Sequence, residues 1–231
     1  MPSPTYVLVH GAWGGKWCWR DLTAEFDARE VRWLSVDLPS SRIDAAADTD
    51  LDDDAAAVVE RARGVGPVVL VGHSYGGSVI TQAAPFVEEL RGLIYVAALL
   101  PQQGESSTDA SRAVKIRTNL DEAIYLDGEF LRLRRELAGA ALYHDCDEEL
   151  ARWALDNLST QTLASFRSAR TSNDVAVPRR YVVCSDDCAI DPSTQAIMAS
   201  RCGDVVAVAS GHSPFFSHPN TLADLILASL N

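Results

Sequence analysis

The segment VLVGHSYGGSVITQAA, residues 69–84, places a serine between glycines where an aliphatic run changes into a helix-like pattern. Residues 72–76, GHSYG, match the pattern G-x-S-x-G. In that pattern the glycines allow a sharp turn from a strand into a helix, because larger side chains would collide with both elements. The sequence therefore predicts a nucleophilic Ser74 at the end of a buried strand, and the alternative is a serine that only occupies a turn.

The same turn predicts one of the two N–H donors of an oxyanion hole. The first amides of the following helix lie beside a nucleophile in this position, so the amide of Tyr75 is the expected donor. The segment VLVHGAWGGKWCW, residues 7–19, supplies a glycine-rich loop after another aliphatic run. There Gly11 lets the chain approach the serine closely, and the amide of Ala12 is the expected second donor.

A nucleophilic serine needs a base, and the base needs an orienting acid. His212 is the candidate base because it follows the last aliphatic run, in VVAVASGHSPFFSHP, residues 205–219. It would then lie at the carboxyl edge of the predicted sheet, within reach of Ser74. The other histidines are expected elsewhere: His10 in a structural role, His73 directed away from the cleft, His218 at a helix start or on the surface, and His144 as a lesser candidate for the substrate pocket.

The orienting acid should follow the penultimate strand, in RRYVVCSDDCAIDP, residues 179–192. Asp186, Asp187 and Asp191 are all candidates there, and the chain order Ser, Asp, His is the order expected on this kind of sheet. A carboxylate in this position would hold the His212 tautomer and stabilise its imidazolium. The alternative for any one of the three is a solvated acidic turn.

Short β-branched runs alternate with amphipathic or alanine-rich segments, which predicts an α/β fold with a mostly parallel central sheet flanked by helices. The expected strands are Thr5–His10, Val31–Val36, Pro67–Val71, Leu93–Ala97, Arg180–Cys184 and Asp204–Ala209. The expected helices are Trp19–Asp27, Asp50–Arg63, Tyr75–Phe86, Pro192–Arg201 and Asn220–Leu230. Residues 102–177 look helical with no convincing strand, so we expect a helical cap insertion within a single domain, residues 1–231, whose core is 1–101 and 178–231.

Composition limits the expected partners. The 231 residues are 47% hydrophobic, which fits one globular domain. Asp and Glu outnumber Lys and Arg by 32 to 20, a formal charge of −12, so nucleic acid and anionic membranes are not expected partners and a small neutral molecule is. No apolar run is long enough for a membrane span, and the first residues lack the features of a signal peptide, so we expect a cytoplasmic protein.

The five cysteines are an odd number and are expected to be reduced thiols. Cys184 and Cys188 in CSDDC have no second Cys or His pair at zinc-ligand spacing. The sequence therefore predicts neither a metal site nor a cofactor.

Four segments, LVHGAWGGKWCW, GHSYGG, RYVVCSDDCAI and SGHSPFFSHP, occur in this order. With them the sequence resembles the α/β-hydrolase family that includes plant methyl-salicylate and methyl-jasmonate esterases, plant hydroxynitrile lyases and bacterial esterases. The resemblance implies the α/β-hydrolase fold and a catalytic triad of Ser74, Asp187 and His212, with Asp187 chosen because of the short apolar step that follows it. It also implies an oxyanion hole at the amides of Ala12 and Tyr75.

The candidate pocket residues are Gly11, Trp13, His144 and Ser213. Lyases of the family tend to carry a hydroxyl or amide side chain just after the first histidine and, in one branch, a lysine just after the catalytic histidine. Gly11 and Ser213 occupy these positions here, and neither suits a lyase. The neighbouring Trp17 and Trp19 either form a pocket wall or pack in the core, and core packing is the expectation.

The implied function is a cofactor-independent serine hydrolase, an esterase or lactonase, that cleaves a small carboxylic ester or lactone through an acyl-enzyme. Two alternatives stay open: a hydroxynitrile-lyase-like enzyme that splits a C–C bond, and a non-hydrolytic protein that binds a small ligand or folds a biosynthetic intermediate. Residues 39–41, PSS, stand where a glycine-rich turn is frequent in the family, which weakens any transfer of plant hormone-ester specificity. The natural substrate and the oligomeric state, a homodimer included, stay open.

Overall fold

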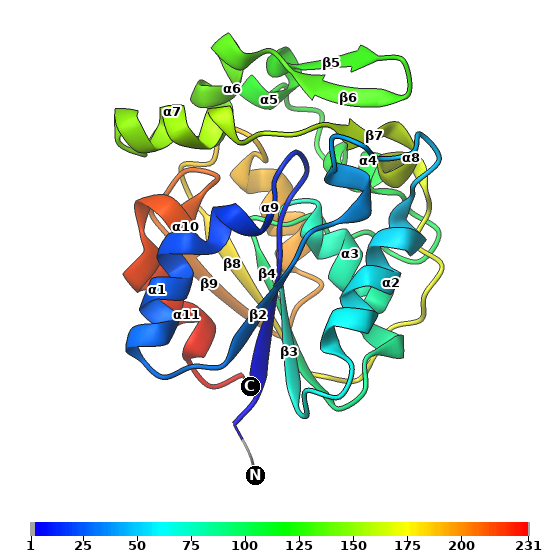
Figure 1. The fold of residues 1–231 in the computed structure, drawn as a ribbon, viewed down its shortest axis with the longest axis vertical. Coiled ribbons are helices and arrows are strands. Elements are labelled where there is room, and N and C mark those ends of the chain that lie inside the picture. The colour runs from blue at the N-terminus through cyan, green and yellow to red at the C-terminus, as the bar shows by residue number, and fades with distance from the viewer. Residues whose placement is uncertain (1–2, 231) are drawn as a thin grey trace.

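The computed structural model describes residues 3–230, and its centre is a six-stranded parallel sheet with helices on both faces (Figure 1). The strand order is β2-β1-β3-β4-β8-β9, and every neighbouring pair is parallel. All six strands expected from the sequence are present, with ends shifted by at most three residues. Their bounds are β1 Thr5–Val9, β2 Trp33–Val36, β3 Val68–His73, β4 Leu90–Val96, β8 Arg179–Cys184 and β9 Asp204–Val208.

Burial on both faces explains why the central strands are apolar, and every residue of β3 is buried. One face is covered by α1 and α11 and the other by α2, α3 and α9, so two hydrophobic clusters lie on either side of the sheet. Among residues 3–230, no helix combines the length and apolar character that a bilayer crossing requires. The core helices are α1 Arg20–Ala28, α2 Leu51–Ala62, α3 Gly76–Ala83, α9 Pro192–Ala199, α10 Pro214–Ser217 and α11 Pro219–Leu227, with 3₁₀ turns at Lys16–Trp19, Pro39–Ser41 and Ala84–Phe86.

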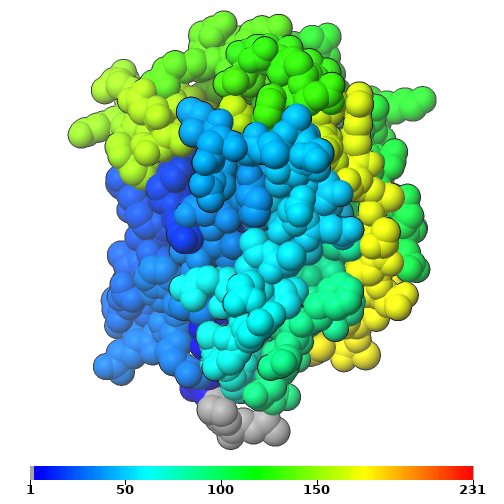
Figure 2. Space-filling model, turned by 45° about the vertical axis from the view of Figure 1, so that its right-hand side comes forward, coloured from blue at the N-terminus to red at the C-terminus, as the bar shows by residue number. Residues whose placement is uncertain are grey.

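The chain between β4 and β8 forms a cap over the carboxyl ends of the strands (Figure 1). Figure 2 shows this part, coloured green to yellow-green, as the top of the molecule. Its helices and strands are α4 Ser107–Ser111, α5 Asn119–Ala123, β5 Ile124–Asp127, β6 Phe130–Leu133, α6 Arg135–Leu142, α7 Glu148–Asp156, β7 Gln161–Thr162 and α8 Leu163–Arg167.

The expectation of a purely helical insertion is wrong, because β5, β6 and β7 form a three-stranded antiparallel sheet. A two-residue loop joins β5 to β6, and Gly128 in it has a φ of 61°, the left-handed conformation that such hairpin loops require. The Asp127-Gly128 pair is the feature of the sequence that indicates a hairpin turn. The four-residue strands around it are too short to distinguish a strand from a helix by periodicity.

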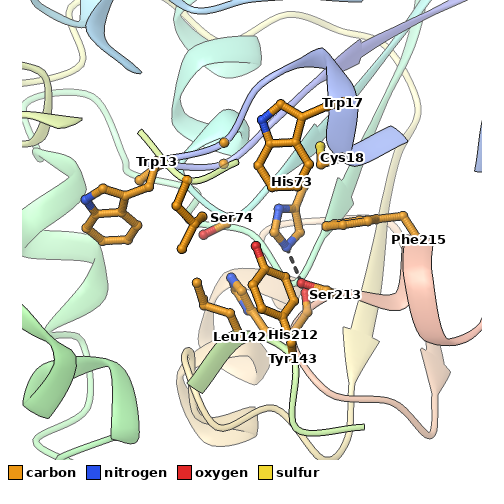
Figure 3. A pocket seen from close by; sticks show the side chains of 14 residues that line it. Trp13, Trp17, Cys18, His73, Ser74, Leu142, Tyr143, His212, Ser213 and Phe215 are labelled. Atoms are coloured by element: carbon orange, nitrogen blue, oxygen red, sulfur yellow. Dashed lines mark hydrogen bonds between the residues drawn. The ribbon is translucent and has the colours of Figure 1, made fainter. Parts of the chain in front are cut away.

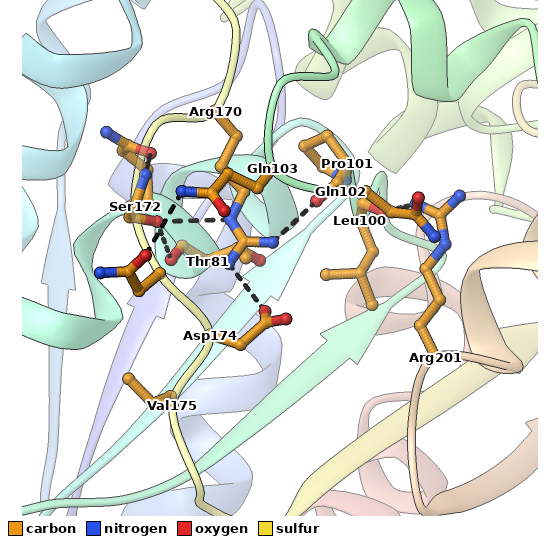
Figure 4. A network of polar contacts seen from close by, with 12 residues as sticks. Thr81, Leu100, Pro101, Gln102, Gln103, Arg170, Ser172, Asp174, Val175 and Arg201 are labelled. Carbon is orange, nitrogen blue, oxygen red and sulfur yellow. Dashed lines mark hydrogen bonds and ion pairs between the residues drawn. The ribbon is translucent and has the colours of Figure 1, made fainter.

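Arg170 ties the two ends of the cap together (Figure 4). Its buried guanidinium donates to Pro101 O at 3.3 Å and to Asp174 Oδ1 at 2.7 Å. Its carbonyl accepts the Gly104 N–H and its N–H donates to Glu105 O, both at 2.8 Å. The cap therefore leaves and rejoins the core at one place.

Candidate active site

Ser74 occupies the tight turn between β3 and α3 and has a positive φ of 53°. This left-handed conformation costs a non-glycine residue about 1–2 kcal/mol, so surrounding contacts must hold it. The Ser74 N–H donates to Val96 O at 3.2 Å, and its carbonyl accepts the Leu99 N–H at 2.9 Å. The turn also needs its glycines, because a Cβ on Gly76 would lie 2.4 Å from Val9 O.

Asp187 and His212 are hydrogen-bonded to each other, with His212 Nδ1 2.8 Å from Asp187 Oδ2. Both side chains are buried, and Asp187 Oδ1 accepts the backbone N–H groups of Ala189 and Ile190 at 2.7 and 3.0 Å. These bonds hold the carboxylate in one orientation toward the imidazole. Of the three candidate acids, Asp187 is the one bonded to His212, whereas Asp191 caps the N-terminus of α9.

Gln195 is a buried residue of α9 that the sequence analysis missed. Its Nε2 donates to Asp187 Oδ2 and to Ile190 O, both at 2.8 Å, while its Oε1 accepts the Cys184 N–H at 3.0 Å. Gln195 therefore ties the acid to the end of β8. A single sequence contains no signal for this role, because the partners meet only in the folded chain.

The expectation that His73 points away from the cleft is wrong. Its Nε2 donates to the backbone oxygen of His212 at 2.8 Å, and the centroids of the His73 and His212 rings are 4.6 Å apart (Figure 3). Burial holds the pKa of His73 well below its ordinary value, so the ring is neutral and carries its proton on Nε2. His73 thus supports the His212 backbone. His10 has the expected structural role, since its Nε2 accepts the Leu38 N–H at 3.1 Å.

Two backbone amides lie beside Ser74. Ala12 lines the same cavity as Ser74, and Tyr75 stands at the N-terminus of α3, where the helix dipole favours negative charge. Gly11 permits this close approach, because a Cβ there would lie 2.8 Å from Ser74 Cβ. Within residues 3–230, neither the Ala12 nor the Tyr75 N–H has a protein acceptor. Backbone N–H groups that converge on one point stabilise an oxyanion there.

The side chain of Tyr75 belongs to a buried polar network. Its OH donates to Asp54 Oδ2 at 2.8 Å, and the Ser40 N–H donates to Asp54 Oδ1 at 3.0 Å. Asp54 forms no ion pair among the described residues, and burial raises its pKa to about 6. Gln161 of the cap donates to Ser40 Oγ at 2.7 Å and accepts from Ser41 Oγ at 2.6 Å. Ser40 and Ser41 therefore connect the core to the cap through Gln161.

A small cavity of about 30 Å³ lies between core and cap and contains Ser74 and His212 (Figure 3). No Lys, Arg, Asp or Glu of the described residues lines it. A space of this size holds about two water molecules. Its apolar wall comes from Trp13, Trp17 and Phe215 of the core and from Leu142, Tyr143 and Leu158 of the cap.

The structure places three of the four candidate pocket residues in the cavity wall: Gly11, Trp13 and Ser213. His144 lies outside the wall and is exposed on the cap. The two residues before it, at the end of α6, line the cavity instead. The sequence did not distinguish these neighbours, because the end of α6 decides which of them faces inward.

The 3₁₀ turn that precedes α1 contributes two of the residues that line the cavity, Trp17 and Cys18. Trp17 lines the cavity, which corrects the expectation of core packing, whereas Trp19 is buried in the core as expected. Cys18 also lines the cavity, and burial raises the pKa of its thiol well above the usual value. Since the thiolate is the reactive form, the raised pKa makes Cys18 a poor nucleophile.

Comparisons with known proteins agree with this fold. The model described as the alpha/beta hydrolase family matches residues 6–225. Methylesterase 7 of Arabidopsis thaliana is 28% identical over 247 residues, which cover 96% of this chain and 94% of the relative. A carbendazim hydrolyzing esterase of Nocardioides sp. (strain SG-4G) is 36% identical over 109 residues, 44% of each chain. The crystal structure of a pyrethroid hydrolase from Sphingobium faniae JZ-2 has the same fold, with a TM-score of 0.83, 24% identity and coverage of 97% of this chain and 96% of that one.

Proposed function

We propose that this chain, which belongs to the alpha/beta hydrolase family, hydrolyses small neutral carboxylic esters or lactones through an acyl-enzyme. The observation that supports this most is the buried Asp187–His212 pair, 2.8 Å from N to O, in which His212 lines the same cavity as a serine held at a φ of 53°. The two sequence relatives named above are both esterases, which supports ester hydrolysis as the reaction class.

In the proposed reaction, Ser74 Oγ attacks the ester carbonyl while His212 Nε2 takes its proton. Asp187, bonded to Nδ1, holds the tautomer in which Nε2 accepts and then stabilises the imidazolium. The N–H groups of Ala12 and Tyr75 donate to the oxyanion of the tetrahedral intermediate. These donors are fixed before the reaction, so they stabilise the charge without reorganisation.

The intermediate then breaks its C–O bond to the alcohol, and the alcohol takes the proton from His212. Water attacks the acyl group on Ser74 with His212 again as the base, and release of the acid restores the serine. Every proton in this scheme moves between substrate, water, Ser74 and His212. A lactone follows the same route, with the alcohol and the acid remaining in one product.

Cleavage of a hydroxynitrile receives less support from the site. Gly11 offers no side chain to a bound substrate. Ser213 occupies the position at which one branch of lyases in the family that the sequence resembles carries lysine. Including a hydroxynitrile among the test substrates, with cyanide as the readout, separates the two reaction classes.

The proposal is tested with short p-nitrophenyl esters, aryl methyl esters and lactones, using wild-type protein and Ser74→Ala. We expect turnover of several short esters by wild type and a loss of about 10³-fold or more in the variant. A fluorophosphonate should label wild type at Ser74. An absence of both turnover and labelling in folded wild-type protein would overturn the proposal.

A further inference from the structure

The cap contributes a carboxylate to the loop that holds the proposed base. Asp145 lies in the turn between α6 and α7, and its Oδ2 accepts the Gly211 N–H at 2.7 Å. The two residues are 66 positions apart and belong to the cap and the core. Because Gly211 directly precedes His212, the cap holds the peptide next to the base.

This contact is close enough to require glycine. A Cβ on Gly211 would lie 2.6 Å from both Asp145 Oδ1 and His144 Cε1. The Asp145 side chain is only 18% exposed, so its carboxylate is largely shielded from solvent. A hydrogen bond to a charged acceptor is stronger than one to a neutral acceptor, and shielding preserves that difference.

The turn that presents Asp145 also forms part of the cavity wall. Leu142 and Tyr143 line the cavity just before it, and the Cys146 N–H donates to Tyr143 O at 3.1 Å, which closes the turn. One short segment therefore contacts the substrate space on one side and the His212 loop on the other.

Titratable groups from several segments face this contact. His218 Nδ1 lies 4.0 Å from Asp145 Oδ2, and Cys146 Sγ lies 4.0 Å from Asp145 Oδ1. Further along the loop, His212 bonds to Asp187 and lies beside the neutral ring of His73. Asp145 thus adds a carboxylate from the cap to the loop whose histidine already bonds to Asp187.

We propose that Asp145 is a positioning residue for the base His212, an assignment that rests on the proposed function. Its carboxylate holds the Gly211 peptide, so that the imidazole keeps its orientation between Asp187 and Ser74.

The chain offers a matched control two residues further on. Asp147 caps α7 by accepting the Leu150 N–H at 2.8 Å, and asparagine caps a helix equally well. Asp147→Asn therefore removes one charge from the same turn without changing the contact to Gly211. The test compares this control with Asp145→Ala and Asp145→Asn.

We expect Asp145→Ala to lower kcat for a p-nitrophenyl ester, and the rate of fluorophosphonate labelling of Ser74, by about 10- to 100-fold, with KM changed by less than about threefold. Asp145→Asn keeps an acceptor oxygen, so its loss should be only about threefold. Asp147→Asn should leave kcat and the rate of Ser74 labelling unchanged.

Thermal unfolding and hydrogen exchange of the Gly211 amide establish that each variant is folded and that the contact is lost in Asp145→Ala. If the folded Asp145→Ala labels Ser74 as fast as wild type, or if only KM rises while kcat is unchanged, Asp145 merely anchors the cap and the assignment is overturned. A wild-type Ser74 that resists the fluorophosphonate would instead overturn the proposed function, and the assignment with it.

Discussion

Residues outside the proposed triad hold the side chains of Asp187 and His212. Gln195 donates to Asp187 Oδ2 at 2.8 Å and also bonds to both backbone groups of Cys184. Gln195→Ala removes these buried bonds, so we expect kcat to fall about tenfold and the free energy of unfolding to fall by about 2–3 kcal/mol. Ester kinetics and urea denaturation measure the two effects. Ser193→Ala, at an exposed position at the start of the same helix, is the control, and equal effects in both variants would contradict this role.

Asp54 should make stability depend on pH. Burial raises its folded-state pKa to about 6 from an ordinary value of 3.8, so the native state binds this proton more tightly than the unfolded chain does. Its contribution to the free energy of unfolding is therefore fully present below about pH 3.8 and is lost as the pH rises through about 6, a change of about 3 kcal/mol. Because asparagine stays neutral, Asp54→Asn should be less destabilised relative to wild type at pH 7 than at pH 4.5.

Urea denaturation of both proteins across this pH range measures the difference. Asp48→Asn, at an exposed position in the preceding loop, serves as the control and should show no such trend. A difference between Asp54→Asn and wild type that does not change with pH would contradict the raised pKa of Asp54.

At the scale of elements, the end of α6 limits the cavity. Leu142 is buried in the wall, and the cavity measures about 30 Å³. Leu142→Ala enlarges this space, so the ratio of kcat/KM for a p-nitrophenyl butyrate over the acetate should rise about tenfold. Leu137→Ala, at a position of the same helix that is 36% exposed and does not line the cavity, should leave the ratio unchanged. An unchanged ratio in Leu142→Ala would show that the acyl group of the substrate does not bind beside Leu142.

The elements also show where sequence reasoning succeeds. The six core strands and the turn at Ser74 are encoded locally, as aliphatic runs and as glycines that a neighbouring backbone requires. The hairpin β5–β6 was missed because its strands are only four residues long. The bond from His73 to His212 spans 139 positions and leaves no periodic signal, so only the folded chain places the two side by side.

For the whole molecule, charge should select among substrates. The chain has a formal charge of −12, and no Lys or Arg of the described residues lines the cavity. A neutral aryl acetate should therefore react at least about tenfold faster, by kcat/KM, than an analogue that carries a carboxylate on the same ring. Raising the ionic strength should reduce the difference by screening the long-range repulsion. Equal rates at low salt would show that the net charge has no influence on binding.

The central claim is a covalent acyl-enzyme on Ser74, and the most direct measurement is intact-protein mass spectrometry after acid quenching of the reaction with p-nitrophenyl acetate. The account predicts one acetyl group per chain, located by peptide mapping at Ser74, and none in Ser74→Ala. Release of p-nitrophenol by wild type without acylation of Ser74, or at the same rate in Ser74→Ala, would contradict it.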